Sequence, residues 1–419
     1  MDETNYAGRL AVFLTCFSST FTLLLTASHQ RPQTVLTNVS NRKMASMNET
    51  IPVLPVTEED RKLFSFPKVI LHLHLDGSVR LSTLFELAKE KESDLECVTD
   101  FEEFKKRLTI HRPVDLSQML APFDLFLPLL VGDADAIERV AYEMCEDQAR
   151  DGVIYFEARY SPHFLSNTVQ NTASSRPGGP FRGKGDLTPK DVVKAVKRGF
   201  DRGEKDFSIK ARQILCFIRG FDSWMHDVLV LAKEMSSYGV VGIDGAGTSI
   251  AAGEDYDESV VKLYKEALEA GIHRTLHAGE SGGANEVVKA VETMHVERIG
   301  HGYHILDDEK AYKEIAIKQK IHLEACPYSS VMTGSVKPNW TQHPVKRWAD
   351  DRINFSISMD DPTCFENTII TEMKLAYQEI GLTITQLWEC MLNAAQSSFA
   401  SDADKKEIIK KIEEAKPQC

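Results

Sequence analysis

The sequence has few cysteines, and they lack the paired spacing of disulfide frameworks and zinc knuckles. Eight cysteines are spread over 419 residues, and no two of them are separated by only two residues. This spacing argues against a cysteine-built metal site and against a small disulfide-stabilised fold. We therefore expect the thiols to be structural and to lie in a reducing compartment.

Basic charge is also scarce. The chain has 49 Lys and Arg residues against 62 Asp and Glu residues, which gives a net charge of −13. Because a chain this acidic repels phosphate backbones, we expect no nucleic-acid partner. Hydrophobic residues make up 42% and charged residues 26%. These are ordinary proportions for a globular protein, so they exclude a disordered chain.

The chain lacks a clear membrane-spanning run. Residues 10–27 are uncharged, but Thr and Ser interrupt them, and the residues before them carry more acidic than basic charge, unlike a secretory or mitochondrial leader. We expect residues 1–54 to be a leader or a poorly ordered tail, with Met44 or Met47 as an alternative start. We expect a cytoplasmic location and no stable membrane anchoring. The alternative is secretion or membrane association through residues 10–27.

Short apolar runs alternate with amphipathic stretches in residues 55–419, which we interpret as one barrel domain. Runs that predict strands are Val69–Leu75, Val153–Arg159, Lys210–Ile218, Val240–Asp244, Arg274–His277, Arg298–Gly300, Ile321–Ala325 and Ile353–Ser358. Stretches that predict helices are Asp133–Arg150, Pro189–Glu204, Asp222–Tyr238, Tyr256–Ala270, Asn285–His295 and Asp308–Lys320. Eight buried strands with mostly helical crossovers predict an α/β fold, a (β/α)₈ TIM barrel with additional helices. An open doubly wound sheet is the competitor, but no GxGxxG motif follows the first strand.

The first predicted strand carries two histidines and an aspartate at its end. His72, His74 and Asp76 are two residues apart, so their side chains point the same way. A lone core histidine is usually explained by a hydrogen bond to the backbone. Two histidines directed into a barrel instead favour a metal site.

Polar side chains also end three later strands. His277 ends the fifth strand and Glu280 follows on the loop, His301 lies between two glycines after the sixth, and Asp360 and Asp361 follow the eighth. Taken alone, Glu280 could be a solvated loop acid and Asp361 a helix N-cap, but an N-cap leaves Asp360 unexplained. The carboxyl ends of barrel strands are where such folds build active sites.

Four of these side chains form a set of nitrogen and oxygen donors suited to zinc or a similar divalent ion. They are His72, His74, His277 and Asp360. They come from the first, fifth and eighth strands and can meet only if the sheet closes. We therefore predict one Zn²⁺ per chain.

Six motifs occur along the chain in the order HLHLDGS, GIDGAG, LHAGE, RIGHGYH, CPYSS and SMDDP. In these motifs the chain resembles the adenosine deaminase family, from about Phe66 to about Phe399. The resemblance implies a zinc-dependent hydrolase acting on a C–N bond. It would convert adenosine and 2′-deoxyadenosine to inosine and 2′-deoxyinosine, with zinc-activated water attacking purine C6 and ammonia released.

The mechanism assigns a role to each remaining candidate. Glu280 would protonate N1 of the purine, and His301 would orient or deprotonate the water. The resemblance implies that Asp76 accepts a hydrogen bond from the ribose 5′-hydroxyl, that Asp361 binds N7 and that the Gly247 N–H faces N3. It also implies an apolar gate over the nucleoside pocket, made of Leu116, Met119, Leu120 and Phe123. The carboxylate of Asp76 would repel a 5′-phosphate.

Some residues depart from the family pattern. Thr248 and Ser249 stand where an acidic pair is usual, Gly245 replaces a bulky apolar residue and Tyr328 stands where Trp is common. These departures concern the shape of the purine pocket rather than the chemistry. The alternatives are a deaminase of adenine, AMP or an N6-modified adenine nucleotide, another amidohydrolase, and a secreted growth-factor-like relative. The expected partner is a small purine nucleoside; the sequence is compatible with a monomer and does not determine the oligomeric state.

Overall fold

The structure is a computed structural model that describes residues 49–91, 95, 99–168, 185–247 and 256–417. The uncharged stretch at residues 10–27, the alternative starts Met44 and Met47, and Thr248 and Ser249 lie outside the described residues. Within the described ranges, no helix combines the length and the apolar character that a membrane crossing requires.

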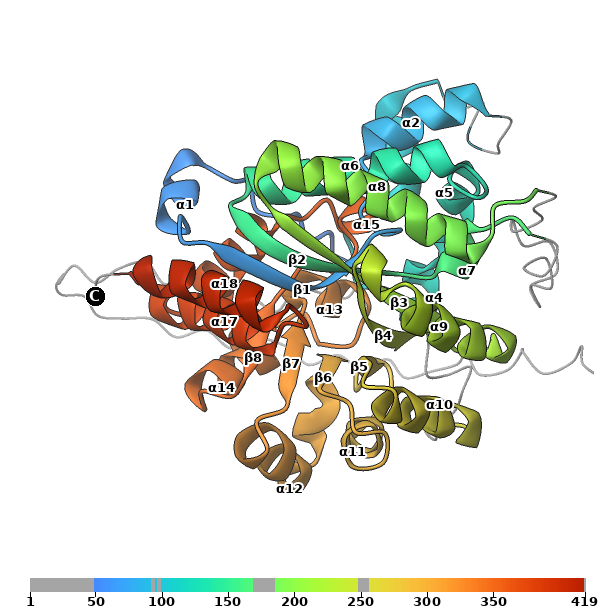
Figure 1. The fold of residues 1–419 in the computed structure, drawn as a ribbon. Helices are drawn as coiled ribbons and strands as arrows, with labels where there is room; N and C mark the ends of the chain where they lie inside the picture. The colour runs from blue at the N-terminus through green and yellow to red at the C-terminus, as the bar shows by residue number, and fades with distance from the viewer. Residues whose placement is uncertain (1–48, 92–94, 96–98, 169–184, 248–255, 418–419) are drawn as a thin grey trace, which may run out of the picture. The chain divides into compact units, whose positions relative to one another are not determined.

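Eight parallel strands form one sheet whose spatial order follows the order of the sequence (Figure 1). The strands are β1 (Lys68–His74), β2 (Val153–Tyr160), β3 (Lys210–Ile218), β4 (Val240–Ala246), β5 (His273–Ala278), β6 (Arg298–His301), β7 (His322–Ala325) and β8 (Phe355–Ile357). All eight predicted strands are present, with ends shifted by at most two residues. The predicted TIM barrel is therefore confirmed.

The sheet closes beyond the end of β8 rather than along it. A parallel bridge joins Leu73 of β1 to Asp360. The N–H of His74 donates to the carbonyl of Asp360 at 3.0 Å, and the N–H of Asp360 donates to the carbonyl of His72 at 3.3 Å. The backbone of Asp360 thus completes the ring next to both histidines of the first motif.

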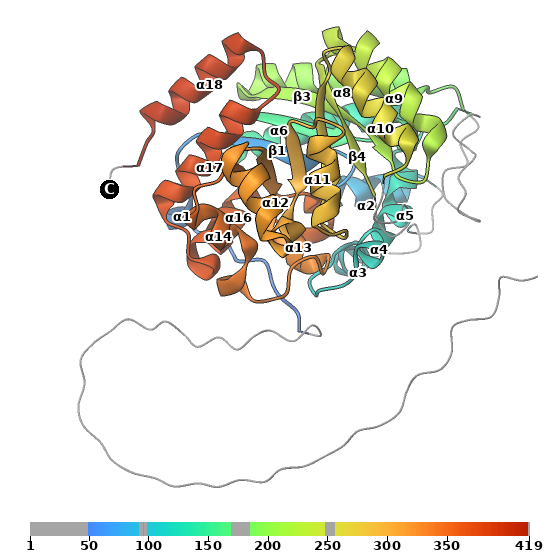
Figure 2. The ribbon, with the colours of Figure 1, turned by 90° about the horizontal axis from the view of Figure 1, so that it is seen from below.

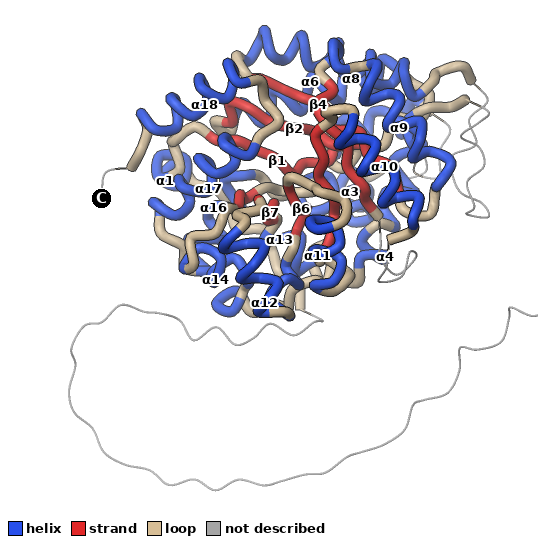
Figure 3. Tube along the Cα trace, turned by 60° about the horizontal axis from the view of Figure 1, so that its bottom comes forward, coloured by secondary structure: helices blue, strands red, loops and turns tan. Residues whose placement is uncertain are grey.

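Helices surround the strands on the outside of the barrel (Figures 2 and 3). They are α1 (Glu58–Leu63), α2 (Leu81–Glu90), α3 (Phe101–Leu108), α4 (Leu116–Met119), α5 (Ala121–Phe126), α6 (Ala134–Arg150), α7 (Pro162–Leu165), α8 (Pro189–Phe207), α9 (Asp222–Glu234), α10 (Glu258–Glu269), α11 (Ala284–Glu292), α12 (Glu309–Tyr312), α13 (Pro327–Met332), α14 (Pro344–Asp350), α15 (Pro362–Phe365), α16 (Ile369–Leu375), α17 (Ile384–Ser397) and α18 (Asp402–Glu414). Short 3₁₀ or π turns lie at Leu127–Leu129, Ser236–Tyr238, Tyr303–Asp307, Lys313–Lys318, Trp340–Gln342 and Ala376–Ile380.

Two predicted helices differ in kind from the observed ones, and two others end three residues away from their predicted ends, at Phe207 and Glu292. The stretch 222–238 is helical only to Glu234, because the chain turns through a 3₁₀ segment and through Gly239, at φ 81°, to enter β4. The stretch 308–320 begins as α12 and continues as a π-helix at Lys313–Lys318. The additional helices of the barrel include α2 to α5, which fill the long connection between β1 and β2.

The interior of the barrel is charged, whereas its outer layer is apolar. Glu157 and Arg159 of β2, Arg298 of β6 and Glu324 of β7 are at most 1% exposed. Arg298 pairs with Glu157 at 2.6 Å and with Glu324 at 2.7 Å. Buried charges are tolerated when they are paired in this way. The strands therefore enclose an electrostatic framework below the pocket, which positions polar groups more rigidly than an apolar filling would.

Candidate active site

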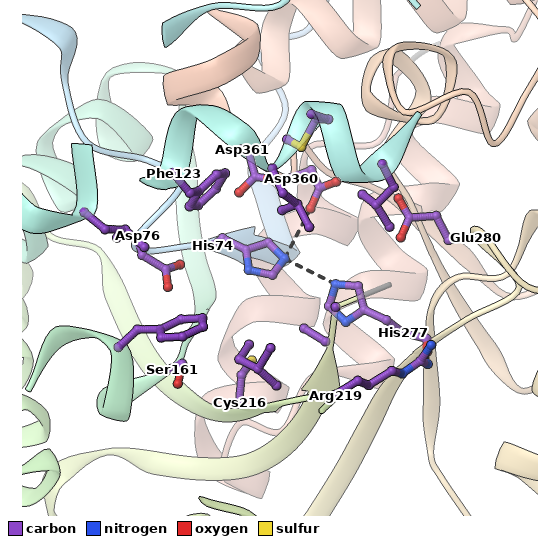
Figure 4. Close-up of a pocket in the computed structure, with 18 of the residues that line it drawn as sticks. His74, Asp76, Phe123, Ser161, Cys216, Arg219, His277, Glu280, Asp360 and Asp361 are labelled. Atoms are coloured by element: carbon purple, nitrogen blue, oxygen red, sulfur yellow. Dashed lines mark hydrogen bonds and ion pairs between the residues drawn. The ribbon is translucent and has the colours of Figure 1, made fainter. Parts of the chain in front are cut away.

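A pocket opens at the carboxyl ends of the strands, where the sequence places its polar motifs (Figure 4). Its apolar wall comes from α4, α5 and the segment after β3, and its polar floor from the strand ends. Twelve of the thirteen predicted site residues line it, namely His74, Asp76, Leu116, Met119, Leu120, Phe123, Gly247, His277, Glu280, His301, Asp360 and Asp361. His72 lies beneath this floor and is fully buried.

The predicted metal ligands meet at the floor of the pocket. One donor atom from each of His72, His74, His277 and Asp360 lies within 4.8 Å of the others. Asp360 Oδ1 is 3.1 Å from His72 Nε2 and 3.3 Å from His74 Nε2, and His74 Nε2 is 3.2 Å from His277 Nε2. Ligands of a tetrahedral zinc ion, at about 2.0–2.2 Å from the metal, lie roughly 3.3–3.5 Å from one another. The donor types and their spacing therefore fit zinc.

A second group of possible ligands overlaps the first. It consists of His72, His301, Cys326 and Asp360. Since it shares His72 and Asp360 with the first group, the two describe neighbouring positions of one site. Cys326 was not predicted from the sequence; the available signal was its place after the seventh strand in the CPYSS motif.

Glu280 and His301 lie beside the ligand cluster. His301 Nε2 is 3.6 Å from Glu280 Oε2 and 3.9 Å from Asp360 Oδ2. Burial, reinforced by the charge of Asp360, raises the pKa of Glu280 to about 8. Burial also lowers the pKa of His301 well below its usual value. At neutral pH the site therefore offers a protonated acid next to a neutral imidazole.

Asp361 occupies the space left by a glycine of the first motif. A Cβ atom on Gly77 would lie 1.8 Å from Asp361 Oδ1. Asp361 is 6% exposed, and its Oδ1 has no hydrogen-bond partner among the described residues. Burial and the neighbouring Asp360 raise the pKa of Asp361 well above its usual value. Asp361 thus presents a buried polar atom to the pocket.

Asp76 lies on the opposite side of His74 from Glu280 (Figure 4). The strand ends at His74, so Asp76 is on the following turn, where it is 7% exposed. Its Oδ1 has no hydrogen-bond partner within the described part of the chain. A ligand that spans the pocket from Glu280 to Asp76 therefore needs a hydrogen-bond donor at its far end.

Besides Cys326, two further site residues escaped the sequence reasoning. Ser329 donates from Oγ to Asp360 Oδ2 at 2.7 Å, which holds the carboxylate that faces the histidines. Arg219, after β3, lines the pocket and donates to the carbonyl of His277. The CPYSS motif marked the neighbourhood of Ser329, but no pattern marked Arg219, because its partners lie far along the chain.

Two of the residues that depart from the family pattern, Gly245 and Tyr328, pack against groups other than the pocket lining. A Cβ atom on Gly245 would lie 2.5 Å from the ring of Phe217, so that ring fills the space of the missing side chain. The hydroxyl of Tyr328 donates to the carbonyl of Ile51 at 2.6 Å. Neither residue lines the pocket. Residues behind a pocket wall also influence its shape, so the effect of these two departures on the purine site stays a prediction.

Comparisons with known proteins agree with this geometry. The adenosine deaminase family profile matches residues 67–415. The adenosine deaminase of Xenopus tropicalis is 41% identical over 85% of this chain and 97% of its own length, and that of Bos taurus is 40% identical over 83% and 93%.

A solved structure shares the fold. A zinc-bound amidohydrolase from Burkholderia ambifaria has a TM-score of 0.71 and 25% identity, over 87% of this chain and 96% of that one. The profile match extends over far more than half of the chain. The curated relatives are matched over nearly their whole length. On this evidence the chain belongs to the adenosine deaminase family.

Proposed function

We propose that the protein hydrolyses adenosine and 2′-deoxyadenosine to inosine and 2′-deoxyinosine with release of ammonia. The observation that carries the proposal is the meeting of three histidines, Asp360 and a buried glutamate in one pocket. The strong similarity to adenosine deaminases over most of the chain supports the substrate class.

The metal would be held by His72, His74, His277 and Asp360, one ion per chain. Zinc held by these residues would lower the pKa of water from about 15.7 to about 7 and would thereby supply hydroxide at neutral pH. Burial lowers the pKa of His277 to about 4, which keeps its imidazole neutral and able to offer a lone pair.

Glu280 supplies the proton that the reaction needs. Attack at C6 breaks the aromaticity of the ring and places charge on N1, and the protonated carboxyl of Glu280 donates to that atom. His301, neutral and 3.6 Å from Glu280, orients the attacking water and accepts its proton. His301 then passes this proton to the 6-amino group, which departs as ammonia. The proton of the new C6 hydroxyl returns to Glu280 as the C6 carbonyl forms, so both residues regain their starting protonation.

The remaining pocket residues bind the nucleoside. Asp361 binds N7 of the purine, the Gly247 N–H faces N3, and Asp76 accepts from the ribose 5′-hydroxyl. The helices α4 and α5 place Leu116, Met119, Leu120 and Phe123 over the pocket as its apolar gate. Because Asp76 is a carboxylate, a 5′-phosphate meets repulsion there, which disfavours AMP and N6-modified nucleotides.

Ammonia release from adenosine, adenine and AMP tests the proposal. We expect activity on adenosine, loss of that activity after zinc is removed by a chelator, and recovery on adding zinc back. Asp76→Ala should weaken turnover of adenosine far more than that of 5′-deoxyadenosine. Activity on AMP or adenine above that on adenosine would contradict the substrate assignment, and equal losses on both nucleosides would contradict the role of Asp76.

We also propose a reducing, cytoplasmic location for this activity. Five cysteines of the described chain are buried and free: Cys145, Cys216, Cys326, Cys364 and Cys390. Thiols kept unpaired in this way support a reducing compartment. Cell fractionation with an antibody to the chain measures the location directly, and recovery mainly from the medium would favour the secreted alternative.

A further inference from the structure

Two of the proposed zinc ligands are held from behind by buried carboxylates. His72 Nδ1 lies 2.8 Å from Glu324 Oε2, and His277 Nδ1 lies 3.0 Å from Asp244 Oδ2. Glu324 is on β7 and Asp244 on β4, and neither is exposed. In each pair the carboxylate accepts a hydrogen bond from Nδ1–H. Nε2 of the same ring therefore carries no proton, and its lone pair faces the ligand cluster.

One guanidinium joins the two carboxylates. Arg159 of β2 donates from Nη1 to Asp244 Oδ2 at 2.8 Å and from Nη2 to Glu324 Oε2 at 2.6 Å. It also donates from Nη2 to the carbonyl of Leu71 on β1, at 2.5 Å. The side chain of Arg159 is fully buried. The guanidinium of Arg159 therefore links β1, β2, β4 and β7 behind the ligand cluster.

The physics of this arrangement favours a rigid unit. Arginine stays charged in proteins, and its planar fork fixes the direction of both hydrogen bonds. The carboxylates it holds stay ionised and fixed, so each imposes one tautomer and one ring orientation on its histidine. Removing one carboxylate would free a ring and would also leave Arg159 with one buried carboxylate partner in place of two.

We propose that Asp244, Glu324 and Arg159 are positioning residues that act as one unit to set the zinc affinity of the site. The proposal rests on the proposed zinc site and goes beyond it, because these residues touch neither substrate nor metal. Groups that orient metal-bound histidines typically change metal affinity by 10–100-fold when they are removed.

Glu157 provides a matched control in the same barrel interior. It is fully buried, accepts from Tyr155 at 2.8 Å and pairs with Arg298 at 2.6 Å. In the described part of the chain, the hydrogen bonds and the ion pair of Glu157 go to Tyr155, Phe399 and Arg298, and none goes to a histidine. Glu157→Gln therefore removes an equally buried charge that contacts no histidine and reaches Glu324 only through their shared partner Arg298.

The experiment measures zinc affinity rather than activity. The metal-free full-length protein is titrated with Zn²⁺ against a coloured competing chelator, and thermal unfolding of each metal-free variant checks that it is folded. We expect Asp244→Asn and Glu324→Gln each to bind zinc 10–100-fold more weakly. Glu157→Gln should stay within about threefold of the wild type, since Glu157 contacts no histidine and Arg298 keeps Glu324 as a partner.

The double variant tests the coupling through Arg159. If the three residues act as a unit, the double variant Asp244→Asn/Glu324→Gln loses less affinity than the product of the two single losses. Should Glu324→Gln not fold, Glu324→Asp keeps the charge for the arginines and shortens the reach to His72, and the same weakening is expected.

The outcomes separate this inference from the proposed function. Wild-type affinity in both single variants overturns the positioning role and leaves the zinc site standing. Losses that multiply fully in the double variant overturn the coupling through Arg159. A wild-type protein that binds no zinc overturns the proposed metal site itself.

Discussion

At the scale of single residues, two side chains of the site depend on strained backbone. His301 has a φ of 67° and Asp360 a φ of 69°, in the left-handed region that few residues other than glycine adopt. Such conformations cost about 1–3 kcal/mol each and persist where the surrounding structure fixes them. Asp360 is fixed by its backbone pairing with β1 and by the Ser329 hydroxyl. The strain therefore marks the positions where the chain is bent to direct polar groups into the pocket.

The acid assignment gives the first residue-scale prediction. Glu280→Gln should keep zinc content and nucleoside binding but lower kcat by about 10²–10⁴-fold, because the amide cannot donate a proton to N1. Steady-state kinetics and elemental analysis measure the two effects. Glu292→Gln, on the exposed face of α11, is the control and should be unchanged. Near-normal kcat in Glu280→Gln would mean that another group supplies the proton.

A glycine gives the second residue-scale prediction. Gly77→Ala places a methyl group where Asp361 lies, so the carboxyl must move. Loss of the hydrogen bond between the purine and the carboxyl group of Asp361 costs about 1.5–3 kcal/mol, so kcat/KM for adenosine should fall by about 10–100-fold. Gly283→Ala is the matched control, since a Cβ there meets no atom of the described chain within 4 Å. Equal kinetics of the two variants would remove Asp361 from the substrate contacts.

At the scale of elements, a buried ion pair ties the loop after β5 to its neighbours. Arg219, after β3, pairs with Glu286 of α11 at 3.3 Å, and both are at most 5% exposed in their side chains. Glu286 Oε2 also accepts from the N–H of Gly279 at 3.1 Å. Arg219 further holds the carbonyl of His277. The position of Glu280 therefore depends on the packing of α11 against the barrel.

Helix α16 carries a buried acid whose protonation affects stability. Burial raises the pKa of Glu372 from 4.5 to about 8. Because the folded state then holds the proton more tightly than the unfolded one, this stabilisation is complete below about pH 4.5. It is lost as the pH rises through about 8.

The test compares variants rather than absolute stabilities. Between pH 5 and 8 the free energy of unfolding should fall with rising pH less steeply in Glu372→Gln than in the wild type. The two slopes should differ by at most about 1.4 kcal/mol per pH unit. Denaturant unfolding at several pH values measures the slopes, and comparison with the wild type cancels the other titrating groups. The exposed Glu413→Gln should keep the wild-type slope; the same slope in Glu372→Gln would show that Glu372 is ionised in the fold.

At the scale of the whole molecule, we propose that the catalytic domain, predicted to begin at residue 55, also includes residues 49–54, and that residues 1–46 are dispensable. The start of the described chain already belongs to the barrel, because the N–H of Ile51 donates to the carbonyl of His111 at 2.7 Å and Tyr328 holds the Ile51 carbonyl. A chain that starts at Met47 keeps these contacts. Its kcat/KM for adenosine should be within about twofold of that of the full chain, and a tenfold drop would assign the removed residues a role.

The sequence by itself determined the barrel and the chemistry of the site. Apolar runs such as Ile214–Ile218 predict strands buried on both faces of a parallel sheet, and the number of eight such strands favours closure into a barrel. The polar motifs then fall at the carboxyl ends of strands, since each run ends where His74, His277 or His301 begins the polar segment. Local periodicity was enough for this because it depends on neighbouring residues.

Only the tertiary structure decided which groups hold the site in place. Asp244 lies 85 residues after Arg159 along the chain, and Glu324 lies 165 residues after it. No spacing rule connects the three residues. The same holds for the space that Gly77 leaves for Asp361. Such contacts arise when the barrel closes and brings distant strands within hydrogen-bond reach, so their partners are set by the three-dimensional packing and not by local order.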